Sequence, residues 1–147
     1  MSLGPIDNSL IIERVKLAPA LGFRQFGGAA DLLAAQEAKP TTPSLFVLSA
    51  RERAQPSQRA GDVLQRVPCV IALVYAVSNV ADIRGKAASD ALRLVRAPTL
   101  QRVIGWSPTV DNAPIQFVGG TLVGFKDQVL WWQDEISSDY YLQGPIS

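Results

Sequence analysis

Histidine is absent from this sequence of 147 residues. Histidine most often exchanges protons near neutral pH and is the commonest metal ligand, so its absence argues against an acid–base enzyme or a metalloprotein. The only cysteine, Cys69, excludes a disulfide within the chain. It lies in the apolar run from Val67 to Val77, where a buried and unreactive thiol is expected. The chain therefore has little of the usual equipment for catalysis.

Charge and long apolar runs are also scarce. Charged residues make up 18% of the sequence and the net charge is +1, so no strong field attracts nucleic acid or anionic lipid. No apolar run reaches the ~20 residues that a membrane helix needs. The N-terminus has no basic segment followed by an apolar one, which argues against a signal peptide. We expect a soluble protein made in the cytoplasm, with part of its weakly charged surface covered by another subunit.

Aromatic residues are concentrated near the end of the chain. All three tryptophans and two of the three tyrosines lie between Trp106 and Tyr141. Residues 114–135 read as three short strands separated by turns, and such large amphipathic side chains suit interfaces. Trp131 and Trp132 are adjacent, so on a strand their side chains face opposite sides. One can enter the core, and the other is expected to meet solvent, a helix or a neighbouring chain.

The order of the predicted elements indicates an α+β domain. Helices and strands alternate in blocks, which predicts a mostly antiparallel sheet with the helices packed on one face. The whole chain, 1–147, is expected to form a single domain, because no repeat or linker interrupts it. The predicted elements are a helix over 7–17, strands over 21–26 and 44–49, a helix over 29–38, a strand over 63–77, and helical pieces over 79–97 and 98–104.

Three of these elements carry detailed predictions. In the strand over 63–77 both alternating sets of side chains are apolar, as expected of a central strand covered on each side. In the helix over 79–97, Asn79 is the predicted N-cap and Leu94 is placed with Val95 on the inner face. Asp7 or Asn8 is expected to cap the first helix.

Residues 51–61 are polar and basic and lie between two predicted strands. We expect them to form a long exposed loop, and residues 143–147 to form a flexible C-terminal tail. Arg51, Arg53 and Arg59 are the best candidates for nucleic-acid contact, but Glu52 dilutes their charge and no aromatic residue lies among them. A partner protein or plain solvent is the favoured environment for this loop.

Few motifs indicate chemistry. Gly27-Gly28 and Gly119-Gly120 lack the surroundings of a phosphate-binding loop, so tight turns or bulges are expected. Asp134, Glu135 and Asp139 could bind Mg²⁺ or Ca²⁺, but a solvated strand end is the favoured interpretation. No serine lies in a Gly-x-Ser-x-Gly elbow. The sequence therefore predicts no catalytic residue, no metal site and no cofactor.

Several segments match a known family in order and spacing. In residues 63–142 the sequence resembles the tail terminator-like proteins of tailed bacteriophages. The matching segments are Ala76-Val77-Ser78-Asn79, Asp82-Ile83-Arg84-Gly85, Leu92-Arg93-Leu94-Val95-Arg96, Gly105-Trp106-Ser107-Pro108, Pro114-Ile115, Gly119-Gly120, Leu130-Trp131-Trp132-Gln133-Asp134-Glu135 and Tyr140-Tyr141-Leu142.

This resemblance implies a structural α+β subunit of the virion, without catalysis or cofactor. Such subunits are expected to form a hexameric ring on the head-proximal end of the tail tube, assembled in the host cytoplasm and without a membrane. The ring would stop tube subunits from adding and would present a surface to head-completion or connector proteins. Genomic DNA passing through the ring could make non-specific contacts.

The residues themselves suggest where subunits meet. We place the predicted contact around Trp131, Trp132, Tyr140 and Tyr141, and expect Arg51, Arg53 and Arg59 to reach a neighbour or the tube. Two alternatives stay open. One is another neck protein, such as a head–tail adaptor, or a tail tube subunit. The other is a small ligand-binding or enzymatic α+β domain.

Overall fold

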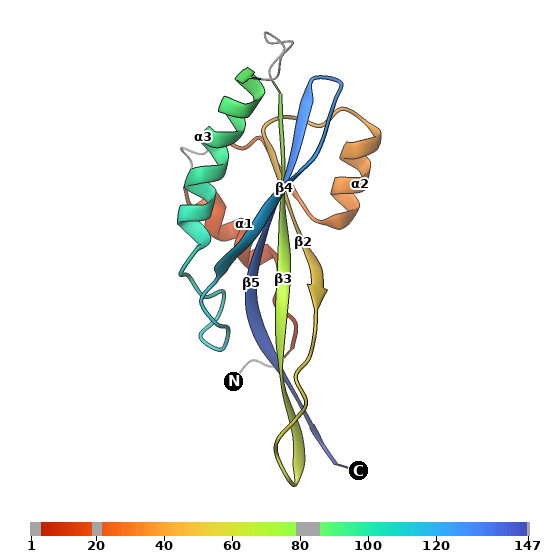
Figure 1. Ribbon diagram of the computed structural model, residues 1–147, viewed down its shortest axis with the longest axis vertical. Helices are drawn as coiled ribbons and strands as arrows, with labels where there is room; N and C mark the ends of the chain where they lie inside the picture. The colour runs from red at the N-terminus through yellow and green to blue at the C-terminus, as the bar shows by residue number, and fades with distance from the viewer. Residues whose placement is uncertain (1–3, 19–21, 79–85, 147) are drawn as a thin grey trace.

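The computed structural model describes residues 4–18, 22–78 and 86–146. One five-stranded sheet, with strand order β1-β2-β3-β5-β4, is packed against three helices (Figure 1). Among the described strands, only β1 and β2 are parallel; the other neighbouring strands are antiparallel. The predicted α+β fold with a mostly antiparallel sheet is confirmed. The elements are α1 Ser9–Lys16, β1 Gln25–Gly27, α2 Ala29–Glu37, β2 Ser44–Glu52, β3 Asp62–Ser78, α3 Lys86–Val103, β4 Gln116–Lys126 and β5 Val129–Pro145.

The helices cover both faces of the sheet. On one face, alternate residues of β3 such as Leu73 and Tyr75 pack with residues of α1 and α3, including Val15 and Val95. On the other face, Val74 and its alternating neighbours pack with Ala35 of α2. The expected packing on one face therefore holds for α1 and α3 but not for α2, which lies on the opposite side in Figure 1. Because β3 is apolar on both faces, each face needs a cover.

The helices differ from the sequence predictions in their ends. Asp7 accepts a hydrogen bond from the backbone N–H of Ser9 at 3.0 Å, whereas Asn8, at the N-cap position of α1, makes no capping bond. Helix α3 continues through Pro98 as one helix, although two pieces were predicted. Leu94 is 72% exposed, so its predicted place on the inner face is wrong; Leu92 faces inward there. The predicted cap Asn79 lies outside the described residues.

Beyond the helices, β3 and β5 continue as a two-stranded ribbon, which forms the lower projection in Figure 1. We call this projection the arm: residues 53–68 and 139–145. The backbone N–H groups of Arg53 and Gln55 donate to β3, so the loop from β2 stays against the ribbon.

The predicted start of the 51–61 loop and the predicted end of the last strand each differ from the structure by two or three residues. Arg51 and Glu52 belong to β2, where they pair with Val70 and Cys69, and not to the loop. Residues 143–145, expected in a flexible tail, are paired within β5 up to Asp62 and Pro145. Continued pairing of β3 and β5 gives backbone donors and acceptors partners there, which explains the longer strand.

Candidate assembly surface

Strand β4 lies at one edge of the sheet and carries large apolar side chains that the rest of the described chain leaves open. Five of its apolar residues are between 45% and 57% exposed: Phe117, Val118, Leu122, Val123 and Phe125. No charged residue occurs from Gln116 to Phe125. Among the described residues only β5 pairs with β4, so its outer backbone edge has no partner strand. An uncharged, apolar edge strand of this kind is a ready site for pairing with another chain.

Two bulges shape this strand. The pairing of β4 with β5 shifts register between Phe117 and Gly119 and again between Leu122 and Gly124. Phe117, Leu122 and Phe125 are opposite Ile136, Trp132 and Leu130 of β5, which belong to the face covered by α1 and α3. These three side chains therefore share a face, and bulges add twist to the edge on which they lie.

A buried ion pair supports β4 from beneath. The side chain of Asp134 is fully buried, and the Nε of Arg96 from α3 donates to its two carboxylate oxygens at 2.9 and 2.8 Å. The indole N–H of Trp132 donates to the same carboxylate at 2.9 Å. The Arg96 guanidinium lies 5.0 Å from the Trp132 ring and 5.8 Å from the Phe117 ring. The cluster thus joins α3, β5 and β4.

The expected solvated position of Asp134 is therefore wrong. A buried carboxylate must be paired and hydrogen-bonded, and Arg96 and Trp132 meet that need. The hydrogen bond from Arg96 to Asp134 raises the pKa of the guanidinium. Burial, with Asp134 nearby, raises the pKa of Tyr75 well above its ordinary value.

Gly120 is required by this cluster. A Cβ atom at Gly120 would lie 2.6 Å from Oδ1 of Asp134 and 2.9 Å from Cζ2 of Trp132. A Cβ at the neighbouring Gly119 would meet nothing within 4 Å. Gly119 follows the first bulge, as the sequence suggested, whereas Gly120 serves close packing of the carboxylate and the indole under the strand.

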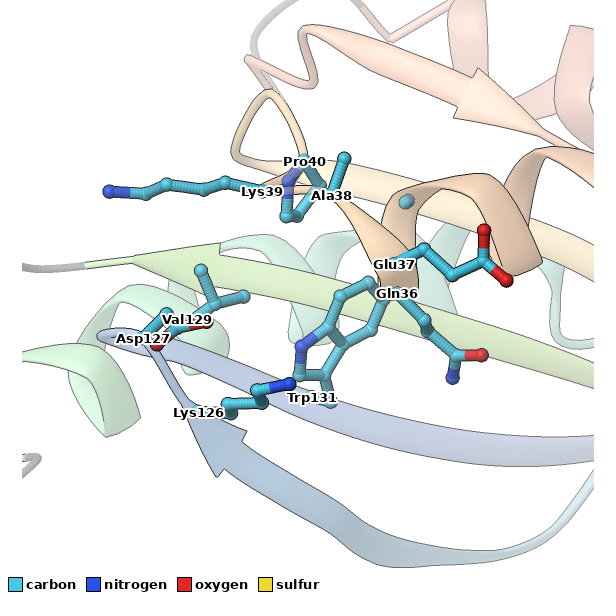
Figure 2. A pocket seen from close by; sticks show the side chains of 10 residues that line it. Gln36, Glu37, Ala38, Lys39, Pro40, Lys126, Asp127, Val129 and Trp131 are labelled. Carbon is cyan, nitrogen blue, oxygen red and sulfur yellow. The ribbon is translucent and has the colours of Figure 1, made fainter.

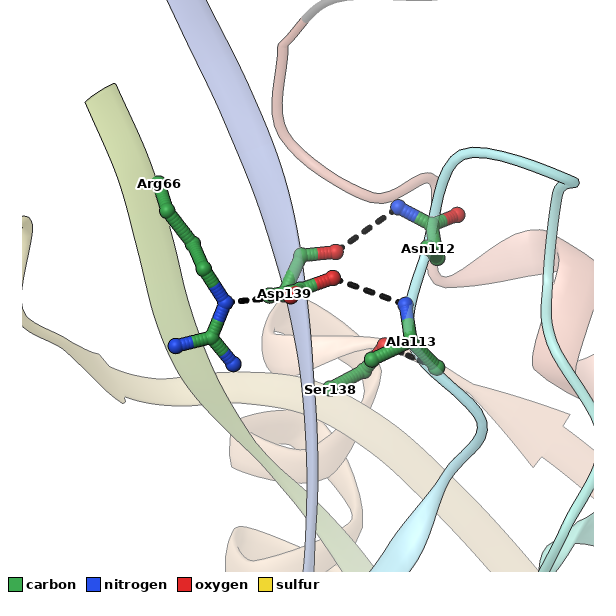
Figure 3. Close-up of polar contacts among 5 residues, drawn as sticks. All are labelled: Arg66, Asn112, Ala113, Ser138 and Asp139. Atoms are coloured by element: carbon green, nitrogen blue, oxygen red, sulfur yellow. Dashed lines mark hydrogen bonds and ion pairs between the residues drawn. The ribbon is translucent and has the colours of Figure 1, made fainter.

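The base of the arm is fixed to the body by Asp139, which is 5% exposed. Figure 3 shows its contacts: Nε of Arg66 donates to the carboxylate at 2.6 Å, and the backbone N–H of Ala113 donates to it at 2.7 Å. Asn112 donates to the backbone carbonyl of Asp139 at 2.8 Å, and Ser138 donates to the carbonyl of Ala113 at 2.7 Å. The loop between α3 and β4 is thereby tied to the start of the arm.

The predicted aromatic contact residues lie mostly inside the subunit. Trp131 is 8% exposed and stacks on Phe46, with ring centroids 6.2 Å apart. Trp132 is half-buried against the opposite face, as the alternation along the strand predicts. Tyr140 is 4% exposed, and burial together with a hydrogen bond to Glu52 raises its pKa to about 12. Tyr141 is half-buried.

The three arginines of the predicted loop have different surroundings. Arg51 forms an ion pair with Glu135 across the sheet. Nε of Arg59 lies 2.8 Å from a carboxylate oxygen of Asp62. Within the described part of the chain, Arg53 has no side-chain partner. Two of these charges are therefore already neutralised inside the subunit.

The cavities bear on the alternative of a ligand-binding domain. The pocket in Figure 2, between the end of α2 and the β4–β5 turn, has a volume of about 50 Å³, too small for a metabolite. A groove of about 590 Å³ lies between α3 and the ends of β2 and β3, and Arg24 is its charged lining residue. A third groove, of about 320 Å³, runs along α3 and includes Leu92, Arg96 and Leu100.

The described ranges contain no group of three or more cysteine, aspartate or glutamate side chains placed to hold a metal ion. None of their helices has the length and apolar character needed to cross a membrane.

Sequence reasoning missed β4 as the exposed apolar surface. The available signal was the run from Gln116 to Phe125, which is mostly apolar and has no charged residue. That signal becomes informative only once the strand order places β4 at an edge, because the same run in a central strand would be core.

Comparison with known proteins gives a match to a family model and matches to solved structures. A family model described as phage tail terminator protein matches residues 1–146. Among solved structures, the chain is similar to a chain of the "Virion of native gene transfer agent (GTA) particle", with a TM-score of 0.53 and 9% identity over 95% of this chain and 96% of that chain. At this identity the likeness shows a shared fold alone. No curated protein matches the sequence.

Proposed function

This chain belongs to the phage tail terminator family, and we propose that it is the ring-forming subunit that ends the tail tube on the side of the head. The family match over residues 1–146 is the observation that carries this proposal. Family membership supports a structural role in the phage tail and a place in the virion, and it favours such a role over an enzymatic one. Assembly in the host cytoplasm is part of the proposal.

In the proposed assembly, six copies of the chain close into a ring, the number that the resemblance to the family implies. A cyclic ring uses heterologous contacts, in which two different patches of each subunit meet and the rotation closes the circle. The exposed apolar edge of β4 is suited to be one of these patches. Trp132 supports that patch from beneath, while Arg53 and Tyr141 lie on the arm, so these predicted contact residues keep a place in the proposal.

The proposed ring has two axial partners. One face meets the tail tube protein and stops further subunits from adding, and the other meets a head-completion or connector protein. DNA crossing the ring would make only weak, non-specific contacts, because the net charge of one subunit is +1. Another neck protein, a head–tail adaptor or a tube subunit remains the competing function within the same class.

Native mass measurement and electron microscopy test this proposal. The purified chain is measured alone and after mixing with tail tubes from the phage that encodes it. We expect a closed ring of defined mass, located at one end of each tube, and no further tube growth after it binds. An open polymer of this chain would instead indicate a tube subunit, and a single copy in an intact particle would contradict the ring.

A small-ligand function makes a different prediction. It requires a metabolite that copurifies with the chain and occupies the groove of about 590 Å³ beside Arg24. Mass spectrometry of the denatured protein detects such a molecule, and we expect to find none.

A further inference from the structure

We infer that the arm of one copy packs on the β4 surface of the next copy. This inference rests on the proposed ring and names the two patches that meet in it. The β4 surface consists of the five exposed apolar residues of β4 and the adjoining groove along α3. The arm is the ribbon of residues 53–68 and 139–145 defined above.

The β4 surface is large enough to need a partner. Its five apolar side chains, each about half exposed, leave on the order of 400 Å² open along the edge strand, and Phe117, Leu122 and Phe125 share one face of it. One partner in a standard interface contributes about 800 Å². The groove along α3, with Leu92 and Leu100 in its lining, supplies a neighbouring surface that can extend the contact.

The outer part of the arm, beyond the buried Val67 and Tyr140, is a second element with exposed apolar residues. Its strands Asp62–Pro68 and 139–145 pair with each other and with the short run after β2. Near the base, the backbone N–H of Gly4 donates to the carbonyl of Tyr141, and Ile6 packs against Val67 and Tyr140. Val63 is 38% exposed and Leu142 is 42% exposed, and both lie on the same face of the ribbon. A two-stranded ribbon is marginally stable alone in water, so an assembly that covers this face stabilises it.

The apolar stretches of the two surfaces both lack charged residues. β4 has no charged residue from Gln116 to Phe125, and β5 has none from Tyr140 to Ile146. Most charges nearby are paired within the subunit: Arg59 with Asp62, Arg66 with Asp139, Arg93 with Asp90, and Arg96 with Asp134. Arg53, at the start of the arm, is exposed and has no side-chain partner among the described residues. Contact between the apolar parts of the two surfaces therefore buries apolar area and leaves the paired charges paired.

The geometry requires a second copy. β5 pairs with β4 up to Ser137 and then enters the arm at Asp139, so the arm leads away from the β4 of its own chain. The contacts of Asp139 with Arg66 and Ala113 hold the base of the arm in that direction (Figure 3). Two different patches that cannot meet within one subunit produce a head-to-tail contact, which closes into a ring when the rotation allows.

Two charge substitutions and their mixture test this inference. Leu122→Glu disables the β4 surface and leaves the arm intact, whereas Leu142→Glu disables the arm and leaves β4 intact. Leu122 is 57% exposed and Leu142 is 42% exposed, so we expect both variants to fold. The matched control is Leu33→Glu on α2, because Leu33 is 63% exposed on a helix outside both surfaces. Circular dichroism verifies the fold of each variant.

Native mass is measured for each variant alone and for an equimolar mixture, with and without tail tubes. We expect Leu33→Glu to form the same ring as the natural chain and each other variant to remain a monomer. In the mixture the intact arm of the Leu122→Glu chain fits the intact β4 surface of the Leu142→Glu chain, so we expect a dimer and no ring.

Disulfide cross-linking tests the same contact if it is too weak to survive the native mass measurement. Chains carrying Val123→Cys and Leu142→Cys should form disulfide-linked ladders on oxidation, while the buried Cys69 stays unlinked. A ring formed by Leu122→Glu or Leu142→Glu alone, or the absence of both dimer and ladder from folded variants, overturns the inference and leaves the proposed ring intact. If the natural chain forms no closed assembly even with tubes, the proposed function itself fails, and this inference fails with it.

Discussion

Strands β3 and β4 are both rich in apolar residues, yet β3 is buried and β4 is largely exposed. From Ile71 to Val77, β3 is at most 2% exposed, because neighbouring strands flank it and helices cover both of its faces. The large apolar residues of β4 are 45–57% exposed, at the edge of the same sheet. One strand, β5, separates them.

The difference shows that apolar character alone does not assign a strand to the core. β3 contributes to the stability of the single chain, because its burial is complete before any partner arrives. β4 has apolar area left over, which can become buried only against another molecule. We therefore expect substitutions in β3 to lower the stability of the subunit and those in β4 to affect assembly.

The largest expected effect comes from truncating a leucine in each strand. Leu73 is fully buried, so Leu73→Ala should lower the free energy of unfolding by about 3–5 kcal/mol through lost burial and a cavity. Leu122→Ala, on the exposed strand, should lower it by less than about 1 kcal/mol. Urea unfolding of the monomer, followed by circular dichroism, measures both.

Similar losses in the free energy of unfolding for Leu73→Ala and Leu122→Ala would contradict the distinction between β3 and β4. A loss of several kcal/mol in Leu122→Ala would mean that β4 belongs to the core of the subunit. The measurement should use concentrations at which the chain is monomeric, because assembly would add the stability of the interface.

Two neighbouring glycines of β4 are expected to differ in the same way, with smaller changes in stability. Gly120→Ala places a methyl group against Asp134 and Trp132, which Arg96 holds in position, so we expect a loss of about 1–3 kcal/mol. Gly119→Ala meets open space, and neither glycine has a positive φ, so this control should be neutral or stabilise by up to about 1 kcal/mol. Thermal unfolding of the two variants distinguishes them. Equal losses of stability in the two variants would show that Asp134 and Trp132 shift to accommodate the added methyl group.

Much of the fold could be predicted because its signals are local. The alternation from Ile71 to Val77 predicted a strand covered on both faces, and the structure confirms it. The position of Leu94 failed because a short shift in the helical register exchanges it with Leu92, and only the packing of α3 on the sheet decides between them. The place of α2 on the second face follows from chain topology, which the local pattern does not contain.

The candidate site was harder to predict because it depends on strand order. Asp134 looks like the first charge after a strand core, yet Arg96, 38 residues earlier, meets it inside the protein. Trp131 and Tyr140 were assigned to an interface from their size, whereas both are buried: Trp131 in the cluster with Phe46 of β2, and Tyr140 against Val67 of β3. The exposure of β4 arises from its position at the edge, and sequence patterns do not state which strand lies there.

The smallest expected effect concerns Tyr140, which lies on β5 beyond the last residue that pairs with β4. Burial raises its pKa from the usual value of 10 to about 12. Because the folded pKa is the higher one, the contribution of Tyr140 to stability is complete below pH 10 and is lost as the pH rises towards 12. At pH 11 the natural chain should have lost about 1 kcal/mol that Tyr140→Phe retains.

Urea unfolding at pH 7, 9 and 11 measures this difference between Tyr140→Phe and the natural chain. Between pH 7 and 9 the difference should stay constant and below about 1 kcal/mol, the scale of one hydrogen bond, here to Glu52. Tyr75 and Cys69 also have raised pKa values, but both variants contain them, so their effects cancel in the comparison. Parallel losses up to pH 11 would mean that the base of the arm admits water around Tyr140. The arm would then be open along its whole length, and its apolar face would depend on a neighbouring copy from the base outward.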